Sequence, residues 1–90
     1  MPQIKVKFFA SFREFTKTKE IELEGGTVED ILEKICIKYP GIENMIFRGS
    51  ELQPFINIFL NGINVLESDG LEMRLHQNDE IAIFPPVSGG

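Results

Sequence analysis

Four stretches of the chain alternate apolar and polar residues, which is the pattern of half-buried β-strands. The first two are residues 4–8 and residues 20–24, where Ile21 and Leu23 stand between glutamates. The connection between them includes residues 10–15, which lose the alternation and are expected to form a short link or one helical turn. Strands this close in sequence are expected to pair as an antiparallel hairpin.

One segment has helical spacing instead. It starts at Thr27, and Asp30 three residues later completes a pattern similar to a capping box. Pro40-Gly41 is expected to end the helix. A single apolar stripe is expected from Val28, Ile31, Leu32, Ile35 and Tyr39.

The third alternating stretch, residues 55–60, is expected to form a strand. Asn61-Gly62 follows it and is a strong hairpin signal, so residues 63–66 are expected to return as a strand. Before this hairpin, residues 42–47 are expected to form a short helical turn and residues 48–53 a loop. The residues expected on the outer face of the third stretch are Phe55, Asn57 and Phe59.

The last alternating stretch is residues 80–84, and Asn78 before it suits a left-handed turn position. The order of elements is therefore strand, strand, helix, strand, short strand, strand. One helix covering one face of a mixed sheet belongs to the α+β class, and this order fits a β-grasp (ubiquitin-like) fold with four to five strands. Inward positions of the last strand are Ile81 and Ile83, and outward positions are Ala82 and Phe84.

The domain is expected to span residues 1–84, followed by an extended tail over residues 85–90. The tail reads Pro85-Pro86-Val87-Ser88-Gly89-Gly90. Proline lacks a backbone N–H and has a fixed φ, so Pro85 is expected to end the sheet and Pro86 to keep the chain extended. The small residues that follow would fit a narrow channel in which ATP activates the carboxylate of Gly90 and sulfur then replaces AMP. In that chemistry Gly90 supplies the reacting group and partner enzymes supply the catalysis.

Three aromatic side chains form the candidate partner interface. If the strand phases are right, Phe9, Phe59 and Phe84 lie on the face opposite the helix. An exposed apolar patch of this kind usually marks a protein interface. The alternative is a satellite core covered by longer loops.

Composition narrows the remaining function classes. Fourteen acidic and nine basic side chains give a net charge of −5, and no basic stripe is present, so neither nucleic acid nor an anionic membrane is an expected partner. The sequence contains no signal-peptide pattern and no apolar run of membrane-spanning length, so a cytoplasmic location is expected. Glu20, Glu22 and Glu24 are expected to be the solvated face of an edge strand, with complementarity to a basic partner as the alternative.

Neither Cys36 nor His76 is expected to carry chemistry. Cys36 lies beside the apolar stripe and reads as a small packing residue, because a reactive thiol needs an exposed, electropositive setting. His76 has no second histidine or cysteine pair at ligand spacing, so no metal site is expected.

Two stretches resemble the small subunit of molybdopterin synthase and its relatives, which include thiamine-pathway sulfur carriers and the ubiquitin-like small modifiers of prokaryotes. They are residues 5–14, KVKFFASFRE, and residues 79–90, DEIAIFPPVSGG, and together they cover about a quarter of the chain. The chain departs from the family pattern at Asn78, where the family has glycine. Residues 44–53 and 67–74 are longer than in a minimal member.

The resemblance implies that Gly90 is adenylated by a ubiquitin-activating-type enzyme and then converted to a thiocarboxylate. The activating enzyme uses the ATP, and the chain itself holds no cofactor. The other implied partners are a sulfur-donating enzyme and the large subunit of molybdopterin synthase, where the tail donates sulfur to the pterin precursor. The family's partner-facing aromatics match Phe9 and Phe84.

Three other functions remain open from the sequence. The chain could carry sulfur for thiamine or tRNA thiolation, because the acceptor of the sulfur is not encoded in the tail. It could be a protein modifier conjugated through Gly90 to lysines, because the chemistry is shared up to the acyl-adenylate. It could also be a non-covalent interaction domain in which the two glycines are incidental.

Overall fold

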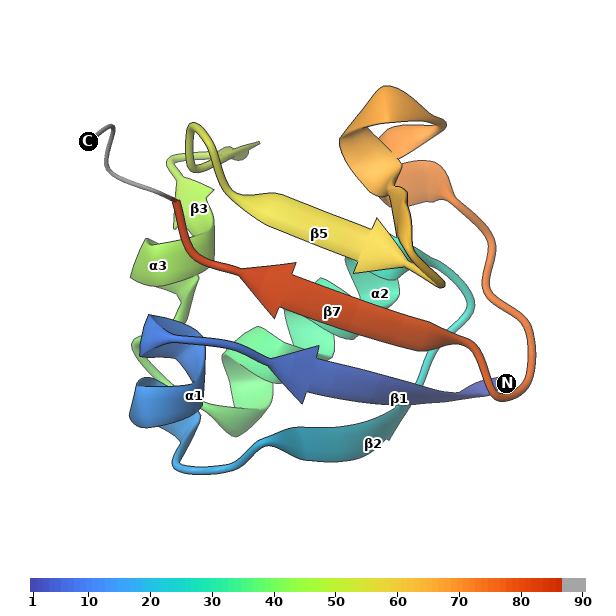
Figure 1. Cartoon of the computed structure of the whole chain (residues 1–90), viewed down its shortest axis with the longest axis horizontal. Coiled ribbons are helices and arrows are strands. Elements are labelled where there is room, and N and C mark those ends of the chain that lie inside the picture. The colour runs from blue at the N-terminus through green and yellow to red at the C-terminus, as the bar shows by residue number, and fades with distance from the viewer. Residues whose placement is uncertain (87–90) are drawn as a thin grey trace.

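The structure is a computed structural model that describes residues 1–86 (Figure 1). In this part of the chain five strands form one mixed sheet in the order β2-β1-β7-β5-β6. The central strands β1 and β7 run parallel, and the other neighbouring pairs are antiparallel. The predicted α+β, β-grasp class is confirmed. The strands are β1 (Gln3–Phe8), β2 (Glu20–Glu24), β5 (Asn57–Leu60), β6 (Ile63–Asn64) and β7 (Glu80–Phe84).

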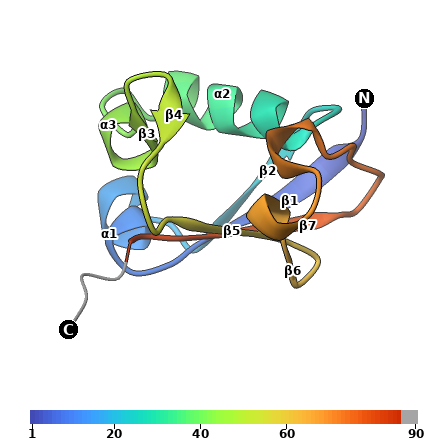
Figure 2. The same cartoon turned by 90° about the horizontal axis from the view of Figure 1, so that it is seen from above.

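The main helix, α2 (Val28–Lys38), crosses one face of this sheet (Figure 2). Its predicted start is confirmed, because the Asp30 N–H donates to the Thr27 hydroxyl at 3.2 Å and the Thr27 N–H donates to the Asp30 carboxylate at 3.2 Å. Two shorter helices, α1 (Ser11–Thr16) and α3 (Glu43–Ile46), flank it. No helix within residues 1–86 is long and apolar enough to cross a membrane.

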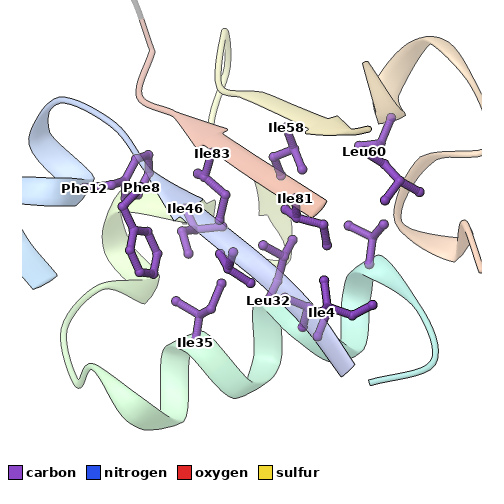
Figure 3. Packing of buried hydrophobic residues seen from close by; sticks show 14 of the residues in the cluster. Ile4, Phe8, Phe12, Leu32, Ile35, Ile46, Ile58, Leu60, Ile81 and Ile83 are labelled. Carbon is purple, nitrogen blue, oxygen red and sulfur yellow. The ribbon is translucent and has the colours of Figure 1, made fainter. Parts of the chain in front are cut away.

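The core lies between α2 and the sheet (Figure 3). The predicted stripe on α2 is confirmed: four of its members are fully buried, and Tyr39 is half-buried with its ring edge-on to Phe8, at 5.8 Å between centroids. Burying these aliphatic side chains supplies most of the drive to fold. Strand residues that complete the core are Ile4, Val6, Phe8, Ile58, Leu60, Ile81 and Ile83.

The third predicted strand was too long at its start, and its return strand was too long at its end. Strand β5 begins at Asn57, and Phe55 lies in a turn with φ 64°, so Phe55 does not share a strand face with Phe59. Strand β6 ends at Asn64, whose side-chain oxygen accepts a hydrogen bond from the Leu66 N–H at 2.9 Å. This contact starts a 3₁₀ turn, η1 (Val65–Glu67), in place of further strand.

The loop predicted over residues 48–53 is also wrong. A second, two-stranded sheet forms there, with β3 (Phe47–Arg48) antiparallel to β4 (Glu51–Leu52). Phe47 and Leu52 are partners in this hairpin, and both pack against the core. Two-residue strands are too short for their alternation to be read from sequence, so tertiary burial is what reveals them.

Strand β7 is held in position at its beginning by side chains from other turns. Asn78 adopts the predicted left-handed conformation, with φ 70°, and its N–H donates to the Gln3 carbonyl at 3.0 Å. The Asn61 side chain accepts from the Glu80 N–H and donates to the Asp79 carboxylate, both at 2.9 Å. These contacts fix the start of β7 between β1 and β5, and thereby the point at which the strand ends.

Candidate functional site

Phe9, Phe59 and Phe84 meet on the sheet and are called the aromatic platform below. The rings of Phe9 and Phe84 are stacked, with centroids 4.3 Å apart and planes 10° apart. The Phe59 ring meets Phe84 edge-on, with centroids 5.6 Å apart at 89°. Both arrangements are favourable for aromatic pairs, so Phe84 joins the other two rings into one surface.

Strand pairing brings the three rings together. Phe84 is the last residue of β7, and the outward neighbour before it, Ala82, lies opposite Phe59 on β5. Phe9 follows β1, and its N–H donates to the Ile83 carbonyl at 3.2 Å, which extends the parallel pairing by one residue. The predicted phases of β1 and β7 are confirmed, since Phe8, Ile81 and Ile83 are buried and Phe9 and Phe84 are half-buried on the other face.

The longer segments of the chain lie on the helix side rather than over the platform. Residues 43–52 form α3, β3 and β4 on the same side of the sheet as α2 (Figure 2). The second longer segment, residues 67–74, is joined to α2, since the Val28 N–H donates to the Met73 carbonyl at 3.1 Å. The platform residues are absent from the core cluster of residues 1–86. The geometry therefore disfavours a satellite core under these two segments.

The first two tail residues, Pro85 and Pro86, follow directly after the platform and are called the tail root. They line a shallow groove together with side chains of α1, α3 and the turn before β5. The predicted site residues Val87, Ser88, Gly89 and Gly90 lie outside the described residues. The other groove residues are Ser11, Phe12, Asn44, Met45 and Gln53.

Charged side chains lie beside the platform, at the edge of the sheet formed by β1 and β2. Lys7 pairs with Glu80 at 3.4 Å, while Arg13, Lys17 and Lys19 form no ion pair within residues 1–86 and line a shallow pocket beside α1. Phe9 lines a second pocket together with Arg13, Lys19 and Glu20, so this pocket adjoins the platform. Strand β2 begins at Glu20, forms the edge of the sheet and presents Glu20, Glu22 and Glu24 outward. Cations and carboxylates are therefore mixed at this edge of the sheet.

Comparison with known proteins decides the family. The family model described as ThiS family matches residues 6–90. The chain belongs to the ThiS family. It is thus a ubiquitin-fold chain in a family of sulfur carriers and small protein modifiers.

Three similar proteins illustrate the range of this family. Small archaeal modifier protein 3 of Haloferax volcanii is 33% identical over 98% of this chain and 99% of its own length. The molybdopterin synthase sulfur carrier subunit of Arabidopsis thaliana is 32% identical over 98% of this chain and 83% of its own length. The solution structure of small archaeal modifier protein 1 from Methanosarcina acetivorans superposes with a TM-score of 0.92, at 42% identity, covering 100% of this chain and 98% of that one.

Cys36 and His76 of this ThiS-family chain lie away from the platform. Cys36 is half-buried against the core; burial raises the pKa of its thiol, and the Glu43 and Glu33 carboxylates raise it further. These are the conditions of a packing residue rather than a nucleophile. The His76 side chain is exposed, and its nearest acidic partner is Asp79 at 3.8 Å. Within residues 1–86 no group of three or more potential ligands could hold a metal ion.

Sequence reasoning missed one surface residue of this ThiS-family chain. The alternation predicts Phe55 on a strand face, whereas the structure places it on a turn next to the tail root, where the residue is 80% exposed. The signal that could have found it is Pro54, because proline favours the second position of a β-turn and places the next residue at the third.

Proposed function

We propose that this chain is a sulfur carrier that works through the carboxylate of Gly90. An oxygen of the carboxylate attacks the α-phosphorus of ATP in a ubiquitin-activating-type enzyme, and pyrophosphate leaves. Hydrosulfide released by a sulfur-donating enzyme then attacks the acyl carbon, displaces AMP and loses its proton. The product is a thiocarboxylate on Gly90. Because the enzyme binds the ATP, the chain needs no cofactor of its own, and its place of work is the cytoplasm.

The observation that carries the proposal is the position of the aromatic platform at the tail root. Phe84 and Pro85 are consecutive, so a protein that encloses the tail from its first residue lies over or beside the three rings. The three rings are half-buried, so part of their surface stays accessible, and aromatic side chains are enriched at the centres of protein interfaces. The family match, which continues through residue 90, supports the role of the tail itself.

We further propose that the sulfur goes to a pterin, with this chain as the small subunit of molybdopterin synthase and a large subunit as its partner. Support comes from the similarity to the Arabidopsis molybdopterin synthase sulfur carrier subunit along nearly all of this chain. Thiamine or tRNA thiolation would use the same thiocarboxylate. Reconstitution with the large subunit and a pterin precursor distinguishes these acceptors. The thiocarboxylate is consumed in that mixture only if the pterin is the acceptor.

A second candidate function is favoured by two of the similar proteins, which are named small archaeal modifiers. In that role a lysine amine, rather than sulfur, displaces AMP and forms an amide with Gly90. Mass spectrometry of cellular proteins for a glycine-containing remnant on lysines tests it. Absence of any conjugate under conditions that express the chain would rule out the modifier role.

The test of the sulfur-carrier role is an intact-mass measurement. The chain, with its C-terminus untagged, is incubated with the activating enzyme, ATP and a sulfur source. The expected result is a mass gain equal to the exchange of one oxygen atom for one sulfur atom. Reactions without ATP are the control, and no gain while the enzyme consumes ATP on this chain would refute the proposal.

The platform gives a second test of this function. Replacement of Phe84 by alanine removes the ring that contacts both others, so it is expected to weaken binding of the activating enzyme by about 2 kcal/mol, or roughly 30-fold in Kd. The matched control is Ile37→Ala, because Ile37 is exposed on α2. Calorimetric titration of both variants measures the difference, and equal affinities would show that the rings are not the docking surface.

A further inference from the structure

Phe55 combines two unfavourable features. Its ring is 80% exposed, the largest exposure of any aromatic side chain in residues 1–86, with Phe15 next among exposed aromatics at 44%. Its backbone has φ 64°, a left-handed conformation that is an outlier for a bulky side chain. Glycine would hold the same backbone at no steric cost. Neither the exposure nor the backbone conformation of Phe55 therefore favours folding.

The turn that holds Phe55 is fixed by hydrogen bonds on either side of it. It runs from Gln53 to Ile56, whose N–H donates to the Gln53 carbonyl at 3.3 Å. A β-turn with proline at its second position and a positive φ at its third position prefers glycine or asparagine at that third position. Gln53 anchors the turn, because its N–H donates to the Ile46 carbonyl at 2.8 Å and its side-chain amide donates to the Asn44 carbonyl at 2.9 Å. The surrounding structure thus imposes the conformation of Phe55.

This turn lies beside the tail root. Asn57 is paired with Phe84 in an antiparallel ladder, so the residues before Asn57 run alongside those after Phe84 (Figure 1). Gln53 lines the same groove as Pro85 and Pro86. An exposed ring at this place stands next to the point where the tail leaves the sheet.

Other exposed apolar side chains do not share this combination. Among residues 1–86 the large exposed ones besides Phe55 are Met1, Phe15, Ile37, Ile63 and Leu66, and none of these has a positive φ. Single exposed apolar residues are ordinary and need no explanation. A strained backbone that holds an aromatic ring outward is different, because strain of this kind persists at binding sites where it positions a group in advance.

We propose that Phe55 is an anchor for the activating enzyme, its ring filling an apolar pocket beside the channel that admits the tail. This inference rests on the proposed function, which requires a protein to receive the tail. Together with the platform, Phe55 gives that enzyme contacts on strand β7 and on the turn beside it. Because the turn is already fixed, the backbone of Phe55 loses little conformational freedom on binding, which favours affinity.

The test compares Phe55→Gly and Phe55→Ala with the wild-type chain. Both variants remove the ring, so both are expected to raise the KM of the activating enzyme roughly tenfold in an ATP–pyrophosphate exchange assay, with kcat unchanged. Only glycine also relieves the backbone, so the melting temperature of Phe55→Gly is expected to match or exceed the wild-type value and to exceed that of Phe55→Ala. Ile37→Ala is the control for loss of an exposed apolar side chain.

Failure of this inference is separable from failure of the proposed function. If the wild-type chain supports no exchange, the proposed function fails. If the wild-type chain is active and both Phe55 variants keep its KM, the anchor is refuted. A clear fall in melting temperature for Phe55→Gly would show that the ring serves folding, and loss of a wild-type dimer in Phe55→Gly, seen by sedimentation, would show that its occupant is a second copy; either result overturns the proposal.

Discussion

Deletion of Gly90 is expected to reduce thiocarboxylate formation at least about 100-fold while the melting temperature stays the same. The deletion moves the reacting carboxylate back by one residue, at most about 3.3–3.6 Å, and misplacement by even about 1 Å can cost a hundredfold in rate. Stability should not change, because the core cluster of residues 1–86 has no member beyond Ile83. Intact-mass time courses and thermal melts measure the two effects.

Two controls sharpen the Gly90 test. Addition of one alanine after Gly90 lengthens the chain and should be as damaging as the deletion, whereas Ser88→Ala keeps the length and should leave the rate within a few-fold. A deletion variant that still gains sulfur at the wild-type rate would show that the reaction does not require the carboxylate of Gly90.

Replacement of Ile83 by alanine is expected to lower the free energy of unfolding by about 2–5 kcal/mol, because a fully buried aliphatic side chain leaves a cavity when it is truncated. Ile83 is 0% exposed and lies on β7, with Phe8 paired on one side and Ile58 on the other. A domain of this size is typically stable by only about 5–15 kcal/mol, so this loss is a large share of the total.

Urea denaturation measures the effect of Ile83→Ala as a lower midpoint with an unchanged slope. The control is again Ile37→Ala, which removes a similar side chain that is 79% exposed and should change stability by less than about 0.5 kcal/mol. If both variants lost the same small amount, the core would not be centred on β7. Phe84, and with it the platform, would then lack the rigid support of this strand.

The residues that stabilise the fold and the residues beside the tail lie in different parts of the molecule. The buried aliphatic residues lie between α2 and the sheet, while the platform and Phe55 lie where β7 and β5 approach the tail root. Exposed side chains can therefore change, and with them the choice of partner, without disturbing the core. This separation fits a family that includes both sulfur carriers and modifiers on one fold.

The sequence by itself determined the elements that have long, regular patterns. Alternation located β1, β2 and β7, and the spacing of Val28, Ile31, Leu32 and Ile35 located α2 with its capping box. The phase of each alternation also determined that Phe9 and Phe84 point away from the helix. These features are local, because a residue's face is set by its position within its own strand or helix.

The tertiary structure alone decided which elements became neighbours. Phe9 and Phe84 are 75 positions apart, and they stack only because β7 pairs in parallel with β1. The hairpin at Phe47 and Leu52 and the turn at Phe55 were likewise missed, because burial against the core and hydrogen bonds from Gln53 define them. Local periodicity shows which side of a strand is apolar but not which strand lies beside it, since that choice depends on how all the apolar faces are buried together.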